Sequence, residues 1–474
     1  MRESFFGACF KLNMLLVFTN NLKLLMNYKT QIPLKNSKLS SNSSNISCLN
    51  VIKYFNGFHS FTTIALFSLF TMTYLFSTNI FAQVVKVTVG ADILMNDSLY
   101  LIQNKRLGIV TNHSAILGNG THLVDTLVTI PNVEVTTLFG PEHGIRGNAP
   151  DGHSIKDGID SKTGLPVYSL YGKTRKPSKE MLENIDVLIF DIQDIGARFY
   201  TYISTLHYTM IAAAENNIPI IVLDRPNPIN GVLVDGPIRT EEFKSFVAIA
   251  PIPIQHGMTI GELAIMFNKE NWLDNGLKAD LTVIKMDGWE REYFFDDCNL
   301  TWVAPSPNMP NLETALIYPG MCLIEGINAS EGRGTYSPFL TFGAPYVSSE
   351  SLLLELERFN NSGIQLDTIS FTPKSIPNMS NYPKYKNIEC GGIKITVVDK
   401  KKLGALRFGI EVLYSIHKLY PDEFEFRKNW LDKLFGNNNL TEMLNNNSTP
   451  DQIFKTWDDE LEDFKKLREN YLLY

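Results

Sequence analysis

Four short apolar stretches in the first half of the chain each end abruptly in a cluster of polar residues. The stretches cover residues 107–111, 133–139, 185–190 and 218–223. Continuous apolar runs of this length are typical of strands that are buried on both faces of a parallel sheet. Ligands bind beyond the carboxyl ends of the strands in open sheets of this kind. We therefore expect the four polar clusters to converge on one crevice, which would be an active site.

Helix-like segments separate these strands and predict the fold class. Residues 122–129 follow the first strand, and residues 200–216 carry Leu206 and Met210 one turn apart beside three consecutive alanines. Alternation of strands and helices with short connections is typical of a doubly wound α/β fold. We therefore predict a Rossmann-like domain with a mostly parallel sheet.

The second half of the chain differs in composition and in the pattern of its apolar residues. Glycine- and proline-rich loops dominate residues 302–345, residues 391–399 alternate as a strand does, and residues 451–471 form an amphipathic helical pattern whose apolar side is expected to pack in the core. The last clear strand–helix unit ends near Gly236-Pro237. We therefore predict a Rossmann-like catalytic domain over 84–236 and a smaller α+β auxiliary domain over 237–474.

Residues 1–83 are predicted to be a low-complexity extension followed by a signal-peptide-like segment. No charged residue lies between Ser60 and Val85, residues 61–76 are largely apolar, and Lys53 lies upstream. This order is that of a secretory signal. A membrane-spanning or anchoring segment is the alternative, but many hydroxyl-bearing residues dilute the run. We expect export to the periplasm or the medium, with the membrane involved only through the signal.

Charge and motif content exclude several function classes. The net charge is -7, which does not favour a nucleic acid partner. The five cysteines form no C-x-x-C pair, so no zinc ribbon or dithiol site is indicated. Residues 330–335 are rich in glycine but lack the ending of a P-loop, and no G-x-S-x-G elbow occurs. Metal binding by His143, Asp191, Asp194 and Asp224 is an alternative, but these residues show no paired metal-ligand spacing, so we expect neither a metal nor a cofactor.

The segment Gly140-Pro141-Glu142-His143-Gly144 carries the strongest chemical signal. Its glycines allow a tight turn directly after a strand. Glu142 would then project from a fixed position, as expected of a general acid or base. The alternative is that Glu142 only caps the following turn and that His143 only satisfies backbone groups.

A second cluster contains Asp191, Asp194, Arg198 and Tyr200. Asp194 and Arg198 are one helical turn apart. The alternative to a functional role is therefore that they are a helix-start acid and its ion-pair partner. Asp191 lies at a strand end, where a cap does not require an acid. This position favours a functional role.

A third cluster, Asp224-Arg225-Pro226-Asn227-Pro228, is stiffened by two prolines. It is either a plain turn or a hydrogen-bonding clamp for hydroxyl or amide groups of a ligand.

With these segments in view, the chain resembles the exo-β-N-acetylmuramidases of the NamZ type. The resemblance extends from about residue 89 to 474. It includes GIVTN at 108–112, LFGPEHG at 138–144, TGLPVYSLYG at 163–172, DIQDIG at 191–196, LDRPNP at 223–228, GMTIGEL at 257–263 and SEGRGT at 330–335. The resemblance implies a Rossmann-like domain and an auxiliary domain with the active site in the cleft between them. It also implies removal of N-acetylmuramic acid from the non-reducing end of peptidoglycan fragments, with Glu142 matching the family's proposed catalytic glutamate.

One departure from the family pattern follows the Glu-His-Gly loop. An Ala-Gly-Glu stretch often stands there in the family, whereas this chain has Asp151-Gly152-His153. If that glutamate contributes to catalysis or sugar contact, Asp151 or His153 replaces it, or the substrate preference has shifted.

Cleavage of a glycosidic bond commonly uses two carboxylates, of which one protonates the leaving oxygen. Glu142 is the predicted acid, and its partner is Asp191, Asp194, Asp224 or Glu331. A carboxyl separation of about 5 Å indicates retention and about 6.5–9.5 Å indicates inversion of the anomeric configuration. Participation by the acetamido group of the sugar is a third possibility.

N-Acetylmuramic acid also carries a lactyl carboxylate, which an arginine fork matches. Arg146, Arg225 and Arg333 are the candidates for this contact. The complete set of predicted substrate-binding residues is Asn112, His113, His143, Arg146, Arg198, Tyr200, Arg225, Asn227, Asn308, Glu331 and Arg333.

The predicted activity is that of a glycoside hydrolase acting on peptidoglycan-derived saccharides or muropeptides. Two alternatives belong to other classes. One is a catalytically inert cell-wall sugar-binding protein, and the other is an ester or amide hydrolase of the same polymer.

Overall fold

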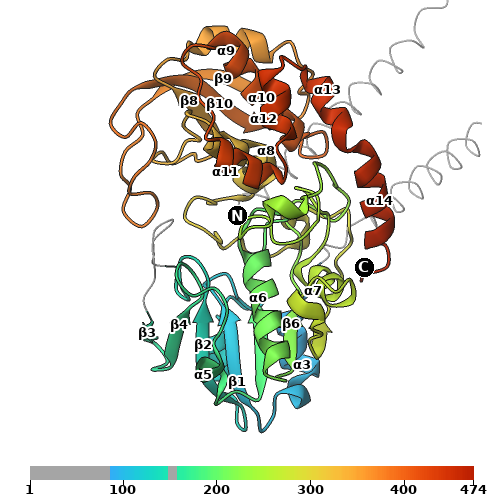
Figure 1. Ribbon diagram of the computed structural model, residues 1–474. Coiled ribbons are helices and arrows are strands. Elements are labelled where there is room, and N and C mark those ends of the chain that lie inside the picture. The colour runs from blue at the N-terminus through green and yellow to red at the C-terminus, as the bar shows by residue number, and fades with distance from the viewer. Residues whose placement is uncertain (1–85, 148–156) are drawn as a thin grey trace, which may run out of the picture. The chain divides into compact units, whose positions relative to one another are not determined.

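The computed structural model describes residues 86–147 and 157–474 (Figure 1). The chain divides into two units between Gln83 and Val84, and all described residues belong to the second unit. The predicted extension and signal segment at 1–83 and the altered stretch at 151–153 lie outside the described residues.

A seven-stranded sheet forms the first part of this unit, with the strand order β3-β4-β2-β1-β5-β6-β7. All neighbours are parallel except β3 and β4. The strands are β1 (Arg106–Thr111), β2 (Glu134–Gly140), β3 (Gly158–Ile159), β4 (Pro166–Ser169), β5 (Val187–Asp191), β6 (Ile220–Leu223) and β7 (Leu281–Ile284). The prediction of a Rossmann-like, mostly parallel sheet is therefore confirmed.

Helices on both faces explain why the central strands read as unbroken apolar runs. In β5, Leu188 and Phe190 pack into the same core as α6, whereas Val187 and Ile189 pack into the core that holds α3 and α4. Every residue of β5 and β6 is buried. The helices of this part are α3 (Gly90–Asp97), α4 (Leu123–Leu127), α5 (Lys179–Leu182), α6 (Tyr202–Glu215) and α7 (Ile260–Lys269), and α6 is seen lying along the sheet in Figure 1.

The sheet extends further along the chain than predicted. Strand β7 pairs in parallel with β6, and α7 packs against both of these strands. The predicted boundary near Gly236-Pro237 is therefore too early for the sheet. β7 escaped prediction because it has only 4 residues and a single fully buried one, which gives a weak apolar signal.

The second part holds a three-stranded antiparallel sheet in the order β8-β10-β9, surrounded by helices. The strand predicted at 391–399 corresponds to β10. The single helix predicted at 451–471 is two helices, α13 and α14, joined by a 3-10 turn at Lys455–Trp457. The elements are α8 (Leu312–Met321), β8 (Thr341–Ala344), α9 (Ser349–Leu356), β9 (Ile364–Phe371), β10 (Cys390–Val397), α10 (Ala405–Leu419), α11 (Lys428–Phe435), α12 (Asn439–Asn445), α13 (Pro450–Phe454) and α14 (Asp458–Arg468).

Helix α8 lies inside the region that was predicted to be mainly loops. It contains Pro319 and Gly320, which disfavour a helix in any prediction from sequence. Gly320 faces α10 at very short range, since a Cβ at this position would lie 1.9 Å from the carbonyl oxygen of Ala405. The glycine therefore permits a close approach of the two helix backbones that no other residue allows.

Within the part of the chain that the structure describes, no helix has the length and apolarity needed to cross a membrane.

Candidate active site

Two adjoining cavities share one set of wall residues and form a continuous cleft. The smaller, here the narrow chamber, has a volume of about 420 Å³, and the larger, here the wide chamber, about 1020 Å³. Both are lined by Glu142, Phe199, Thr201, Tyr318 and Arg333. Glu142 therefore lies where the two chambers meet.

One wall of the cleft comes from the part of the chain that forms the seven-stranded sheet, here called the sheet part. The second wall comes from the part that begins with α8. The narrow chamber is completed by His143, Tyr200, Tyr202, Ser306, Asn308, Met309 and Phe339. The wide chamber is completed by Tyr171, Val247, Cys322, Glu325, Glu331, Ser380, Asn381, Tyr382, Pro383, Lys384, Arg427, Trp430 and Leu434. The second wall contributes most of the charged groups.

Glu142 is held in place by the turn that follows β2. Its neighbour His143 has φ 71° and Gly144 has φ 73°, and the amide of Gly144 donates to the carbonyl oxygen of Pro141 at 3.0 Å. A left-handed histidine is unfavourable and persists where the surrounding structure enforces it. Thr201 Oγ1 donates to Glu142 Oε2 at 3.5 Å. The carboxyl group is thus half-buried and directed at the cleft by a fixed backbone.

Tyr200, two residues before α6, and Tyr202, the first residue of this helix, line the narrow chamber together with Glu142. Asn112 Nδ2 donates to the Tyr202 hydroxyl at 2.9 Å, and this hydroxyl donates to the carbonyl oxygen of Pro305 at 2.5 Å. Burial raises the pKa of both Tyr200 and Tyr202 far above the usual range, and the charge of Glu142 raises it further. Both phenols therefore remain protonated. Asn112 acts on the cleft indirectly, through Tyr202.

An ion cluster lies on the opposite wall of the wide chamber. Glu331 Oε1 lies 3.2 Å from Arg333 Nη1, and Glu331 Oε2 lies 3.2 Å from Lys384 Nζ. Burial by itself would raise the pKa of Glu331, but the charges of Lys384 and Arg333 outweigh it and the net shift is downward. Glu331 is therefore an ionised carboxylate in the cleft.

Three residues of this wall were not predicted from the sequence. Glu325 Oε1 lies 2.6 Å from Arg333 Nη1, and Trp430 Nε1 donates to Glu325 Oε2 at 3.2 Å. Lys384 Nζ donates to the carbonyl oxygens of residues 324, 327 and 329 at 2.8–2.9 Å. These residues come from three distant segments, none of which ends a strand of the parallel sheet. No local signal in the sequence brings them together.

Asp191 lies at the end of β5 but lines neither chamber. It is fully buried and forms a two-point ion pair with Arg225, at 2.6 Å from Oδ1 to Nε and 2.9 Å from Oδ2 to Nη2. Arg225 Nη2 also donates to the carbonyl oxygen of Ile116. Both charges are therefore engaged within the protein, away from Glu142.

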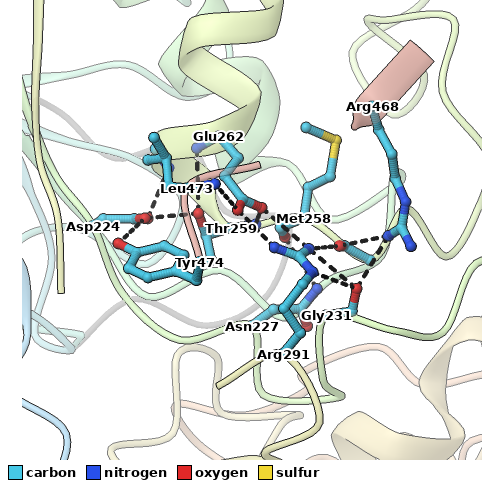
Figure 2. A network of polar contacts seen from close by, with 12 residues as sticks. Asp224, Asn227, Gly231, Met258, Thr259, Glu262, Arg291, Arg468, Leu473 and Tyr474 are labelled. Carbon is cyan, nitrogen blue, oxygen red and sulfur yellow. Dashed lines mark hydrogen bonds and ion pairs between the residues drawn. The ribbon is translucent and has the colours of Figure 1, made fainter. Parts of the chain in front are cut away.

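Asp224 belongs to a separate buried network, which Figure 2 shows. Its carboxylate accepts hydrogen bonds from Thr259 Oγ1 at 2.7 Å, the amide of Gly261 at 2.8 Å and the Tyr474 hydroxyl at 2.8 Å. Burial, and secondarily the charge of Glu262, raises the pKa of Asp224 to about 7. The first two donors belong to the first turn of α7, so Asp224 ties β6 to this helix.

The rest of this network joins the last residues of the chain to the loops after β6. Glu262 is fully buried and lies 2.7 Å from Arg291 Nη1, and it accepts from the amide of Leu473 at 2.8 Å. Arg468 Nη1 donates to the carbonyl oxygen of Gly257 at 2.8 Å. Asn227, a predicted substrate contact, donates to the carbonyl oxygen of Met258 at 3.0 Å. These polar groups bind one another (Figure 2), and none of them lines either chamber.

Asp194 lies behind the tyrosines, outside both chambers. Its Oδ2 accepts from the amide of Gly196 at 2.8 Å and lies 3.9 Å from His256 Nε2. Burial raises the pKa of Asp194 to about 7 and lowers the pKa of His256 to about 3. At neutral pH His256 is therefore uncharged, and Asp194 is protonated below about pH 7 and ionised above it.

Arg198, one residue before the cleft wall, is part of the interior. Its Nη1 donates to the carbonyl oxygens of Pro237 and Ile252 at 2.7 Å, and its Nη2 donates to those of Leu434 and Phe435 at 2.9 and 2.7 Å. The predicted pairing with Asp194 is not formed. Arg198 instead connects the sheet part to α11.

His113 and Arg146 line a different cavity, of about 1110 Å³, with His122, Asp125 and Lys162 among its other residues. Arg146 Nη2 lies 2.8 Å from Asp125 Oδ1 and 2.7 Å from Asp160 Oδ2. Arg333 is thus the candidate for the lactyl contact that lines the cleft, whereas Arg146 and Arg225 do not line it.

Asn308 and His143 do line the narrow chamber, as does Tyr200. Asn308 is 2% exposed, and its Oδ1 has no hydrogen-bond partner among the described residues. A buried carbonyl oxygen without a partner is costly, so its presence in a cavity points to a ligand donor. In residues 86–147 and 157–474, no three His, Cys, Asp or Glu side chains are grouped in a way that could hold a metal ion.

Comparisons with known proteins agree with this geometry. The chain is 46% identical over 399 residues to the peptidoglycan β-N-acetylmuramidase NamZ of Bacillus subtilis, covering 84% of this chain and 94% of the relative. Crystal structures of two DUF1343-family proteins from Bacteroides fragilis superpose with TM-scores of 0.75 and 0.68 at 36% and 37% identity, each covering 82% of this chain and 99% of the other.

Both domains of one family match in sequence order. The N-terminal domain of exo-β-N-acetylmuramidase NamZ matches residues 107–313, and its C-terminal domain matches residues 316–474. The division between them lies at the start of α8, where the second wall of the cleft begins. The chain therefore belongs to the exo-β-N-acetylmuramidase NamZ family.

Proposed function

We propose that this protein is an exo-acting glycosidase that removes β-linked N-acetylmuramic acid from the non-reducing end of peptidoglycan fragments. Its family membership and the name of its Bacillus subtilis relative support this activity. The observation that carries the proposal is the position of Glu142, a half-buried carboxyl group at the junction of two chambers with the carboxylate of Glu331 on the facing wall.

Glu142 is the proposed proton donor. In cleavage, the bond between the anomeric carbon and the leaving oxygen breaks, its electron pair stays on that oxygen, and the Glu142 proton is transferred to it. Positive charge develops on the sugar ring. This charge is centred on the anomeric carbon, at the junction of the two chambers, and water adds there with loss of its proton to complete the hydrolysis. Glu331, kept ionised by Lys384 and Arg333, lines the adjoining wide chamber and is the second carboxylate of the cleft, which stabilises the charge at that junction or positions the water.

Arg333 is the proposed contact for the lactyl carboxylate. It lines both chambers, and its guanidinium carbon lies 4.8 Å from the centroid of the Phe339 ring. The ring fixes the guanidinium plane, which favours two-point binding of a carboxylate. The protonated hydroxyl of Tyr200 lies in the narrow chamber to position a hydroxyl or acetamido group of the same sugar, whereas the Tyr202 hydroxyl already donates to Pro305.

Release of a chromophore from an aryl β-N-acetylmuramide tests the function. We expect turnover by the protein, lower turnover in Glu142→Gln, and weaker activity on the matching aryl β-N-acetylglucosaminide, which lacks the lactyl group. Equal activity on both glycosides would contradict the arginine contact. Saccharide binding without turnover would favour an inert binder, and loss of acetyl or peptide groups by mass analysis would favour an ester or amide hydrolase.

Export is also proposed, on the strength of the apolar, uncharged stretch that precedes residue 84. Expression of the full chain with a C-terminal tag, followed by cell fractionation and N-terminal sequencing, tests it. We expect a product outside the cytoplasm that begins close to Gln83. An uncleaved chain in the membrane fraction would instead support the anchoring alternative.

A further inference from the structure

The two chambers differ from each other, and this difference indicates how the substrate is oriented in the cleft. Glu142 lines both chambers, so the bond to which it donates a proton lies at their junction. The sugar that is released must occupy one chamber and the leaving group the other. An exo-acting enzyme needs a closed end for the terminal sugar and an open side for the rest of the chain.

The narrow chamber has the properties of the closed end. Its volume of about 420 Å³ is less than half that of the wide chamber, so it is the chamber that suits a single terminal sugar. Tyr200, Tyr202 and Asn308 in its wall are all at least nine-tenths buried, and Asn308 Oδ1 has no partner among the described residues. Such groups select one ligand closely, because any that stays unpaired costs binding energy.

The wide chamber has a different character at its outer side. Its volume is about 1020 Å³, and Tyr382 in its wall is 85% exposed. The loop that carries Tyr382 is firmly fixed, because Lys384 Nζ, two residues on, donates to three backbone carbonyl oxygens. Pro383, between them, packs against Gly334, where a Cβ would lie 2.6 Å from Pro383 Cγ. A large aromatic side chain is thus presented to solvent on a rigid support, at little entropic cost on binding.

We propose that the wide chamber is the site for the leaving saccharide and that Tyr382 is its specificity-determining residue. The ligand is an uncharged hexosamine linked to the muramic sugar, whose ring face of C–H groups would pack on the phenol ring. This assignment rests on the proposed glycosidase function. An aromatic ring offers a flat apolar surface while its hydroxyl stays in water, which suits a sugar ring that is apolar on its faces and polar at its edge.

The test compares two substrates that share the muramic sugar and differ in the leaving group. One is the aryl β-N-acetylmuramide, and the other is the disaccharide of N-acetylmuramic acid linked to N-acetylglucosamine. In Tyr382→Ala we expect the ratio of kcat/KM for the disaccharide to kcat/KM for the aryl glycoside to fall about five- to tenfold.

Tyr336→Ala is the matched control. Tyr336 is also 85% exposed, and its loop contacts the Tyr382 loop through Gly334, but it lines neither chamber. The ratio should not change in this variant. Asn308→Ala, in the narrow chamber, should lower kcat/KM for both substrates by a similar factor, with the unfolding midpoint recorded to separate misfolding from lost contact.

Each outcome bears on the assignment. Unchanged kcat/KM values for both substrates in Tyr382→Ala would overturn the role of Tyr382. An equal loss on both substrates would reverse the direction of the cleft and place the muramic sugar in the wide chamber. If the unmodified protein cleaved neither substrate, the glycosidase function itself would be overturned, which is a distinct result from either failure of the subsite.

Discussion

Glu142 and Asp191 both follow strands of the same parallel sheet, yet they have opposite surroundings. Glu142 is half-buried, lines both chambers and lies on a turn with left-handed residues. Asp191 is fully buried and bound at two points by Arg225. Asp224, after β6, resembles Asp191, because it is engaged by α7 and Tyr474. Position at a strand end therefore gives a carboxylate a fixed place, and the residues that approach from elsewhere decide whether it meets solvent or other protein groups.

The largest expected effect is on catalysis by Glu142→Gln. The amide cannot donate a proton as an acid does, so kcat/KM for a disaccharide should fall about 10³–10⁴-fold. The loss should be smaller for an aryl glycoside, whose leaving oxygen needs less protonation. The unfolding midpoint should not change. A loss that was equal for both leaving groups would contradict the role of Glu142 as proton donor.

The second-largest expected effect is on folding stability and not on catalysis. Arg225→Met leaves the Asp191 carboxylate buried without its partner, which should lower the free energy of unfolding by about 3–5 kcal/mol, as measured by urea denaturation. Asp191→Leu combined with Arg225→Met removes both charges and should recover much of this loss. Turnover per folded molecule should be preserved in the double variant. Loss of turnover in the double variant would instead show that Asp191 takes part in catalysis.

The next effect is a pH-dependent difference in the free energy of unfolding between Asp194→Asn and the unmodified protein. The pKa of Asp194 is raised to about 7 by burial, so the folded protein binds this proton more tightly than the unfolded chain does. The resulting stability is fully present below about pH 4 and is lost as the pH rises through about 7. Asp194→Asn should therefore become more stable relative to the unmodified protein between pH 5 and pH 8, by about 2 kcal/mol. Urea denaturation at the two pH values measures this, and Asp224, present in both proteins, cancels from the comparison. A difference that did not change with pH would show that Asp194 titrates normally.

The smallest expected effect is that of Tyr474→Phe. This change removes the hydrogen bond from the phenol to Asp224 Oδ2 and the acceptor for the amide of Met286, each 2.8 Å long. The free energy of unfolding should fall by about 1–2 kcal/mol, with kcat/KM unchanged. A change in kcat/KM would connect this network (Figure 2) to the cleft, although none of its residues lines either chamber.

Much of the sheet could be predicted because β1, β5 and β6 are buried on both faces and are therefore apolar except at the ends of β1 and β5. The elements that escaped prediction lack such a signal. β7 is short and only partly buried, and α8 is buried on all sides from Thr314 to Met321, so it has no amphipathic pattern and also contains a proline.

The residues of the site, like the elements of the fold, could be predicted only where the sequence carries a local signal. Glu142 could be identified because a strand, a glycine and a polar cluster coincide in sequence. Glu325, Lys384 and Trp430 could not, because their proximity arises only when the second part folds against the sheet part. The sequence also does not reveal that Arg225 lies against Asp191, which is 34 residues away along the chain.

Arg198 has a consequence for how the enzyme receives its ligand. Its guanidinium holds carbonyl oxygens of residues 237 and 252 on one side and of residues 434 and 435 on the other, one position before Phe199 of the cleft wall. Separating the two walls would strip a desolvated cation of these oxygens, which is expensive. The two walls are accordingly tied together behind Phe199, and we expect glycan ends to be selected by their fit to a preformed site.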